Sequence, residues 1–297
     1  MSVFALKCIA ILVMLIDHTG YILALVGYAD GWTIRIMRCL GRIAFPVFAF
    51  MLVNGLQKTR DRAAYLSRLA LFAIISRVPF SLAFCASNYL PAALRGAESS
   101  ISLDPLWLHQ LPLILLAALV YYLLLHRRGR PGFGYVLAAL ILPLFRLKLG
   151  GIVLMDEYLN IFYSLAISLA FICAVDAIMT NDSRYTPVEL ALLVSAAAAA
   201  ALYILPNADY SYRAPLLIAL IYLFRNSRLA QALAMAAWCV CMYSFNPLFI
   251  AGGLCACLLI ALYNGKKGPA FKMGFYLFYP VHLFVLYALV FLYNNFR

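Results

Sequence analysis

The chain has 297 residues, of which 66% are hydrophobic and only 11% are charged. Soluble domains have roughly 45–50% apolar and about 25% charged residues, so this composition excludes a soluble protein and predicts an integral membrane protein. Basic residues in the connections between apolar segments account for most of the net charge of +12. That pattern is typical of membrane topology and of attraction to lipid headgroups, and it predicts no nucleic-acid partner.

Apolar segments follow one another along the chain, and they break at polar residues, glycines and prolines. They predict an all-α polytopic membrane protein with about ten to eleven transmembrane helices in a single bundle, which forms one integral-membrane domain over residues 1–297. The expected helices cover residues 3–27, 34–56, 63–86, 106–126, 133–149, 157–179, 187–205, 212–225, 229–244, 247–264 and 271–293. We expect the first to be retained and not removed as a signal peptide, because it is long, contains ionisable residues and lacks a small-residue cleavage site.

The basic residues predict the orientation, because Lys and Arg collect on the cytoplasmic side of membrane proteins. With a cytoplasmic N-terminus, twelve of these residues lie on the cytoplasmic side and five on the other. The cytoplasmic group comprises Lys58, Arg60, Arg62, Arg127, Arg128, Arg130, Arg184, Arg225, Arg228, Lys266, Lys267 and Lys272. The opposite group comprises Arg95, Arg146, Lys148, Arg213 and Arg297. We therefore expect a cytoplasmic N-terminus and an odd number of spans.

The first helix carries ionisable residues at a depth where charge is costly and usually functional. Lys7 and His18 are eleven residues apart, which places them on one helix face and roughly 16 Å apart along its axis. A lysine near a helix end can simply extend toward the headgroups, and a buried histidine can be a satisfied core residue. The alternative is that this face holds a long cytosolic donor and that His18 meets its reactive end.

Asp17 precedes His18, and the two side chains project about 100° apart. Asp17 therefore needs a separate cationic partner. The second helix presents a stripe of arginines at i, i+3 and i+7, namely Arg35, Arg38 and Arg42. We expect Arg42, the deepest, to pair with Asp17, and Arg35 and Arg38 to lie at the outer membrane boundary. Pro46 should kink this helix.

Further polar residues lie in the third, sixth and later segments. Arg77 precedes a proline kink, where a second buried ion pair and a substrate contact are both compatible with it. Asn160 and Ser164 lie four apart on the sixth helix and either pack helices or contact substrate. Asp209 and Tyr210 lie in the outer connection PNADYSY, where an aspartate is usually solvated.

The last helix contains FYLFYPVHLF, in which Tyr279 and His282 share a face near the middle of the membrane. The eight cysteines include two Cys-x-Cys pairs, but residues two apart on a helix point in nearly opposite directions and cannot bind one ion. We assign them apolar packing, and we expect no metal site and no dinucleotide motif.

Two intramembrane histidines, an aspartate, buried arginines and basic cytoplasmic connections are compatible with two classes of function. The first is acyl transfer from a cytosolic phosphate-bearing donor. The second is proton-coupled transport, in which Asp and His also serve as relay groups. A membrane scaffold with structural ion pairs is a third interpretation.

Three stretches of the chain resemble the TraX family, which is known for the F-pilin acetylase. They are LKCIAILVMLIDHTGYIL, RCLGRIAFPVFAFMLVNGLQKTRDRAAYLSRLALFAIISRVPF, and LYNGKK followed by FYLFYPVHLFVLYAL. The resemblance is close in the first third and the last tenth of the chain and looser between them. It implies a multi-pass enzyme of the bacterial inner membrane that transfers an acetyl group from acetyl-CoA to an acceptor amine, such as a pilin N-terminus.

The resemblance also implies roles for individual residues. The catalytic set is Asp17, His18, Arg42, Tyr279 and His282, with His18 as base or nucleophile, and Gly41 also matches the family pattern. The family's Thr-Arg pair falls on Thr59 and Arg60. From the basic residues themselves we expect the donor set to be Lys7, Lys58, Arg60, Lys266 and Lys267. The acceptor set is Asn160, Ser164, Asp209 and Tyr210.

Three positions depart from the family pattern. Arg77 stands where Gln or Glu is expected, Ser164 replaces a threonine, and no glycine follows Asp209 and Tyr210. The last two departures concern the acceptor set, so the acceptor stays open between an amine and the hydroxyl group of an envelope sugar or lipid.

Overall fold

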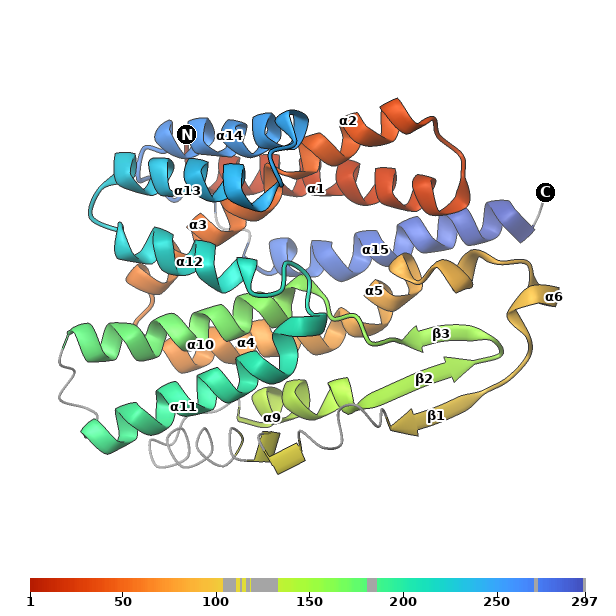
Figure 1. Ribbon diagram of the computed structural model, residues 1–297, viewed down its shortest axis with the longest axis horizontal. Coiled ribbons are helices and arrows are strands. Elements are labelled where there is room, and N and C mark those ends of the chain that lie inside the picture. Colours follow the sequence, from red (N-terminus) through yellow and green to blue (C-terminus); the bar gives the residue numbers. More distant parts are fainter. Residues whose placement is uncertain are drawn as a thin grey trace. The chain divides into compact units, whose positions relative to one another are not determined.

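The computed structural model describes residues 1–103, 133–180, 186–269 and 272–295, together with residues 111, 112, 114, 115 and 118 (Figure 1). The expected helix 106–126 lies almost entirely outside the described residues, as do Arg127, Arg128, Arg130, Arg184 and Arg297.

Helices dominate the described residues. The longest are α1 (Val3–Val26), α10 (Ile161–Met179), α11 (Pro187–Ile204) and α15 (Lys272–Asn295). Two consecutive pairs are α2 (Gly31–Gly41) with α3 (Ala44–Lys58), and α4 (Arg62–Ile75) with α5 (Arg77–Phe84). The shorter α-helices are α6 (Ala92–Arg95), α9 (Phe133–Ile141), α12 (Arg213–Leu223), α13 (Arg228–Met242) and α14 (Pro247–Ala261). The 3-10 turns are η1 (Ala86–Tyr89), η2 (Leu142–Leu144) and η3 (Leu205–Asn207). The strands are β1 (Ser100–Leu103), β2 (Phe145–Leu149) and β3 (Ile152–Met155).

The all-α polytopic fold is confirmed. Within the described residues, five helices are long and apolar enough to cross a membrane, and six if the bent pair α4 and α5 forms one span. Four shorter apolar helices fall below that length. Every expected segment except 106–126 therefore has a counterpart in the structure. The counterparts are the five long helices, the bent pair and the four shorter helices.

The expected helix 133–149 is wrong in its second half. The helix ends at Ile141, and η2 and β2 follow. Pro143 lacks the backbone N–H that a continuing helix needs, and the alternating pattern of Phe145–Leu149 suits a strand, whose side chains repeat every two residues. The three strands form an antiparallel sheet in the order β1-β2-β3.

Side-chain caps begin several of the helices. The Ser2 side chain accepts a hydrogen bond from the Ala5 N–H at α1, and the Asp30 carboxylate accepts two from backbone N–H groups at α2. Thr186 and Glu189 form a reciprocal capping box at α11. At the break between α4 and α5, next to Pro79, the axis bends by 44°, which confirms the expected kink beside Arg77.

The chain divides into two compact units, and each is assembled from several segments. Unit 1 contains Met1–Gly55, Leu82–Arg95 and Leu216–Arg297, and unit 2 contains Leu56–Ser81 and Gly96–Pro215. In unit 1, α1 packs against α2 and α15, and α14 packs against α2 and α13. In unit 2, α4 packs against α9 and α10, and α10 packs against α11.

Helices α1 and α15 run parallel in unit 1. Near their first turns Phe4 contacts Phe275, and near their ends Tyr28 contacts Tyr293. The first and last long helices of the chain therefore point the same way, as an odd number of spans requires. The side of the membrane on which the N-terminus lies stays a prediction.

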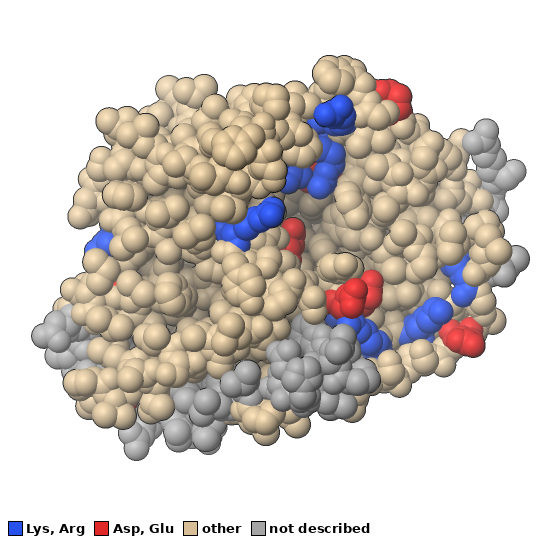
Figure 2. All heavy atoms as spheres, viewed as in Figure 1, with Lys and Arg blue, Asp and Glu red and all other residues tan. Residues whose placement is uncertain are grey.

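Connections expected on the same side of the membrane also meet within each unit. The Val3 N–H donates to the Lys266 carbonyl, and Arg62 at the start of α4 pairs with Asp176 near the end of α10. On the face shown in Figure 2, most of the surface carries neither basic nor acidic residues, and Lys and Arg atoms lie over α2. This sparse distribution of charge is what a lipid-facing surface requires.

Candidate active site

Two histidines from helices far apart in the sequence meet in unit 1. His18 on α1 and His282 on α15 are 9% and 6% exposed. The Nδ1 atom of His18 lies 2.8 Å from Nε2 of His282. The Nδ1 atom of His282 lies 2.7 Å from the backbone carbonyl oxygen of Phe278. A linear chain of hydrogen bonds therefore joins a carbonyl group to both imidazole rings.

This chain of hydrogen bonds determines where the protons lie when both rings are neutral. The carbonyl oxygen of Phe278 can only accept, so Nδ1 of His282 carries a proton and Nε2 of the same ring accepts. Nδ1 of His18 must then be the donor between the two rings. The second nitrogen of His18, Nε2, keeps a lone pair, so it is the ring atom that can accept a proton or attack a carbonyl group.

Aromatic rings surround the two imidazoles and fix their orientation. The His18 ring meets Phe84 edge-on with centroids 5.1 Å apart and Tyr279 edge-on at 6.0 Å, while the His282 ring stacks on Phe278 at 4.6 Å. Tyr279 is 4% exposed and also meets His282 at 5.6 Å. The expectation that Tyr279 and His282 share one helix face is confirmed.

Asp17 turns away from the histidine pair toward α2. Its Oδ2 atom lies 2.8 Å from Nη1 of Arg38, and its Oδ1 atom lies 3.4 Å from Nη2 of Arg42. The expected pairing of Asp17 with Arg42 is confirmed. The expectation that Arg38 only lies at the outer boundary is wrong, because Arg38 is the nearer partner.

A glycine makes this approach possible. A Cβ atom added to Gly41 would lie 2.2 Å from Cγ of Asp17, and one added to Gly20 would lie 2.7 Å from Cβ of Met37. These two glycines therefore let α1 and α2 pack closely enough for the Asp17 carboxylate to lie between two guanidinium groups. Small residues commonly permit such close packing of membrane helices.

The Arg42 guanidinium has more contacts with surrounding groups than the Arg38 guanidinium. The Arg42 Nε atom donates to the carbonyl oxygen of Arg38 at 3.0 Å, and the guanidinium lies over the rings of Tyr243 and Phe249. The helix breaks at this point, since α2 ends at Gly41 and α3 begins at Ala44, two residues before Pro46. The expected kink is thus a short interruption of the helix beside the ion pair.

Lys7 and His18 share one face of α1, as expected, because both contact α15. The Lys7 ammonium lies 4.9 Å from the centre of the Phe275 ring. At this end of unit 1, the backbone N–H groups of Val3 and Phe4 donate to the carbonyls of Lys266 and Lys267. The first backbone N–H groups of α1 are therefore occupied. The side chains of Lys266 and Lys267 are both exposed at this end.

Sequence reasoning assigned no role to Arg228, which lies at the same end of unit 1. Its Nη1 atom donates to the carbonyl of Tyr263, its guanidinium lies over the Tyr263 ring, and its Nη2 atom approaches Gly265. The sequence indicated Arg228 only as one of the basic residues expected on the cytoplasmic side. Lys58 and Arg60, the other expected donor residues, belong to unit 2.

The four expected acceptor residues gather in unit 2. The Asn160 side chain accepts from the Phe162 N–H at 3.1 Å and donates to the Ala73 carbonyl at 2.8 Å, so it caps α10 and ties it to α4. The Ser164 hydroxyl donates to the Asp209 carbonyl. Tyr210 has a positive φ of 62°. For Asn160 and Ser164, the packing interpretation accounts for every contact described.

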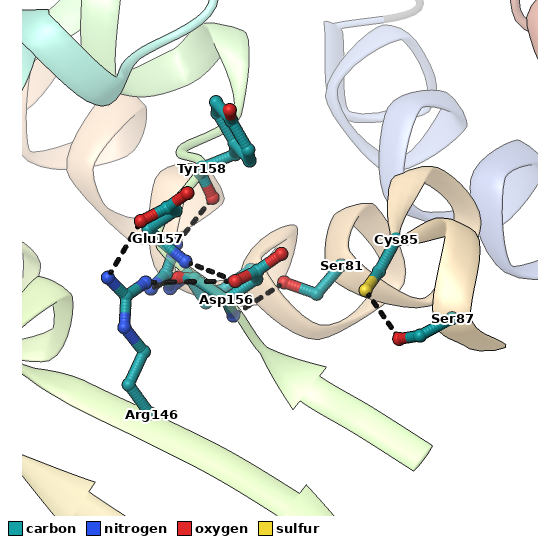
Figure 3. Close-up of polar contacts among 8 residues, drawn as sticks. Ser81, Cys85, Ser87, Arg146, Asp156, Glu157 and Tyr158 are labelled. Atoms are coloured by element: carbon teal, nitrogen blue, oxygen red, sulfur yellow. Dashed lines mark hydrogen bonds and ion pairs between the residues drawn. The ribbon is translucent and has the colours of Figure 1, made fainter. Parts of the chain in front are cut away.

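Arg77 lies in a polar cluster of unit 2 with 0% exposure. Its guanidinium donates to the carbonyls of Tyr158, at 2.7 Å, and Asp156. Arg146 reaches the carboxylates of Asp156 and Glu157 (Figure 3). Arg77 thus binds backbone carbonyls and holds the segment that leads from β3 into α10. A substrate contact of Arg77 stays a prediction.

The cysteines of each Cys-x-Cys pair point to different environments. Cys239 and Cys257 are buried, whereas Cys241 and Cys255 are exposed. Among the residues that the structure describes, no three His, Cys, Asp or Glu side chains lie close enough together to hold a metal ion.

The fold and this site define a multi-pass α-helical membrane protein with a buried histidine pair beside a buried ion pair. The sequence model of one family, described as TraX protein, matches residues 2–147 and 136–290. The chain therefore belongs to the TraX family.

A curated relative covers nearly the whole chain. It is the probable fimbrial assembly protein FimC, serogroup H1, of Dichelobacter nodosus, which is 28% identical over 301 residues, covering 96% of this chain and 94% of the relative. No solved structure matches the chain.

Proposed function

We propose that this protein is an acyltransferase of the bacterial inner membrane that moves an acetyl group from cytosolic acetyl-CoA to an acceptor amine. The observation that carries the proposal is the hydrogen-bond chain from the Phe278 carbonyl through His282 to His18, which leaves Nε2 of His18 as the reactive nitrogen. Membership of the TraX family supports the same reaction.

In the proposed reaction His18 is the general base. Its Nε2 atom takes a proton from the acceptor amine as the amine nitrogen attacks the thioester carbonyl carbon. The imidazolium that forms keeps its Nδ1–H bond to His282, and His282 keeps its own N–H on the Phe278 carbonyl. When the C–S bond breaks, His18 returns the proton to the thiolate, so the products are an acetamide and free CoA. The alternative is that His18 attacks the thioester itself and carries the acetyl group.

Other residues of the site bind and orient. The buried Tyr279 phenol, next to both imidazoles, is proposed to stabilise the oxyanion or to contact the acceptor. The ion pair of Asp17 with Arg38 and Arg42 holds α1 against α2 and so fixes the height of His18 in the membrane.

The donor phosphates are proposed to bind at the end of unit 1 where the N-terminus meets the connection before α15. Lys266 and Lys267 supply exposed ammonium groups there, and Arg228 lies close by. Lys58 and Arg60 belong to unit 2, so their expected part in donor binding stays a separate prediction. Lys7 and His18 lie along the face of α1 that packs against α15, and the thioester arm is proposed to follow this helix seam to the base.

A pilin N-terminus is the proposed acceptor, because the relative from Dichelobacter nodosus is named a probable fimbrial assembly protein. Asp209 and Tyr210 stay expected acceptor contacts of unit 2, whereas the contacts of Asn160 and Ser164 are those of helix packing. The alternatives are O-acetylation of an envelope sugar or lipid, and proton-coupled transport.

One experiment separates these three functions. Purified protein in nanodiscs is incubated with acetyl-CoA and a pilin N-terminal peptide, and the product is analysed by mass spectrometry. The proposal predicts an acetyl group on the terminal amine that resists hydroxylamine, whereas an ester on a hydroxyl group would be cleaved. A carrier would instead move a solute across vesicles in the absence of acetyl-CoA, and it would leave both peptide and donor unchanged.

A further inference from the structure

Unit 1 is strongly depleted of acidic residues. It contains two of the eleven acidic residues of the chain, Asp17 and Asp30, but eleven of the twenty-three Lys and Arg residues. The Asp30 carboxylate is occupied at the start of α2, where it accepts hydrogen bonds from the backbone of Trp32 and Thr33 and from the Thr33 hydroxyl. Asp17 is thus the single carboxylate of unit 1 that lies within the membrane segments, and it is shared by two arginines.

Arg38 is the member of this ion pair that is available to a further anion. Its side chain is 26% exposed, compared with 13% for Arg42. One edge of its guanidinium is fixed by Asp17, and its carbon centre lies 5.1 Å from the centre of the Tyr21 ring. A planar guanidinium held in this way presents its remaining N–H groups in a fixed direction, which suits a carboxylate.

A strip of aromatic rings leads from Arg38 to His18. The Tyr21 ring meets Phe84 at 5.1 Å, and the Phe84 ring meets His18 at 5.1 Å. Tyr21 and Phe84 are both half-buried, so the strip is partly accessible along its length. The steps along the strip amount to at most about 15 Å, and an extended peptide rises roughly 3.3–3.6 Å per residue. Three residues together with the side chain of an acidic third residue therefore reach from one end of the strip to the other.

We infer that Arg38 is the anchor for a carboxylate of the acceptor, which is a polypeptide whose acidic side chain lies within about three residues of its reactive amine. The inference rests on the proposed function and deepens it by naming the acceptor class. The peptide backbone lies along Tyr21 and Phe84, the terminal amine reaches Nε2 of His18, and the acidic side chain pairs with Arg38. The surplus positive charge of the Asp17 ion pair is then neutralised by the substrate.

The test uses two acceptors that differ only in charge: C-terminally amidated alanyl-alanyl-glutamate and alanyl-alanyl-glutamine. The wild-type protein is expected to have a KM roughly 10- to 100-fold lower for the glutamate peptide, as one charge-assisted hydrogen-bonded pair implies. Arg38→Gln is expected to remove this preference, so that the KM values of the two peptides become equal. The ratio of the two KM values is the readout, because a looser contact between α1 and α2 would affect both peptides alike. Arg38→Lys keeps part of the preference.

Arg35→Gln is the matched control, because it removes the same charge from the same helix one turn away and should leave the preference intact. If Arg38→Gln raises the KM of both peptides equally, Arg38 is structural and the inference is overturned. Equal KM values in the wild-type protein overturn it as well, and so does a preference for an amine lipid over both peptides.

Binding of the two peptides without acetyl-CoA is measured in parallel by isothermal titration calorimetry. If the wild-type protein transfers no acetyl group, the proposed function fails, while the binding preference still decides the anion site. Preferential binding of the glutamate peptide that disappears in Arg38→Gln supports the site, and equal binding of the two peptides overturns it.

Discussion

Nδ1 of His18 and Nε2 of His282 lie 2.8 Å apart in a buried environment, although 264 residues separate them in the sequence. Both nitrogens of His282 are occupied, one by His18 and one by the Phe278 carbonyl. In the proposed reaction His282 therefore acts on substrate through His18, as a positioning residue. The expectation that His282 belongs to the catalytic set stays a prediction.

Replacing His282 should impair turnover and spare donor binding. His282→Ala removes the acceptor for the Nδ1–H of His18, and we expect kcat to fall by about 10²–10³ while the affinity for acetyl-CoA stays unchanged. His282→Gln should retain part of the activity, because its amide oxygen can accept from His18. The measurement is CoA release at saturating donor, with thermal unfolding as a check on folding. Equal kcat values for wild type and His282→Ala would rule out the positioning role.

Gly41→Ala should destabilise the protein. The new Cβ would lie 2.2 Å from Cγ of Asp17, so α1 and α2 must move apart, and overpacking of this kind costs about 1–3 kcal/mol. Gly31→Ala is the matched control on the same helix, because a Cβ there meets nothing within 4 Å. Thermal unfolding in detergent measures both variants. A Gly41→Ala midpoint no lower than that of Gly31→Ala would show that the helices do not need this close approach.

Ser211→Gly should stabilise unit 2. Tyr210 and Ser211 have positive φ values of 62° and 44°, a conformation that is strained for residues with a Cβ atom and unstrained for glycine. The sequence lacks the glycine expected after Asp209 and Tyr210, and the structure keeps the turn without it. We expect a gain of about 0.5–1 kcal/mol in thermal unfolding, with no gain for Ser211→Ala. A loss of stability in Ser211→Gly would mean that the serine side chain stabilises the turn.

The cap of α2 predicts a pH dependence outside the membrane segments. Hydrogen bonds from the Thr33 hydroxyl and backbone N–H, and from the Trp32 N–H, lower the pKa of Asp30 below its ordinary value. A carboxyl group whose pKa is lowered by folding stabilises the protein fully above its unfolded pKa, and this contribution is lost as the pH falls through the folded value. Wild type should therefore exceed Asp30→Ala in thermal stability near pH 7.

That advantage should shrink below about pH 4. Asp30→Asn is the control, since asparagine caps a helix without titrating. A wild-type advantage over Asp30→Ala that is independent of pH would show that the ionised carboxylate does not form the cap.

The sequence predicted the helices well because the apolar segments are long and end at polar residues. It also predicted the pairing of Asp17 with Arg42, since a buried carboxylate needs a cation and α2 follows α1 directly. It failed for Arg38, because the close approach of α1 and α2 at Gly41 brings the Asp17 carboxylate within reach of Arg38 as well as Arg42. A periodic pattern does not reveal such a packing distance.

The contact between His18 and His282 lay beyond sequence reasoning for a different reason. Each histidine could be singled out by its depth in an apolar segment, but nothing local states that the first and last helices of the chain lie side by side. Likewise, residues 142–149 read as the end of an apolar helix. The competing signals were a single proline and a short alternating pattern, which are weak against a hydrophobic run.

In the proposed function the protein transfers an acetyl group from acetyl-CoA with His18 as the general base. The most direct test is acceptor-dependent release of CoA by purified protein in nanodiscs, with wild type beside His18→Ala and with acetyl-CoA binding measured in the same samples. Both proteins are expected to bind acetyl-CoA, and only wild type is expected to release CoA when an acceptor is present. Release at the wild-type rate by His18→Ala, or failure of wild type to bind acetyl-CoA, would contradict it.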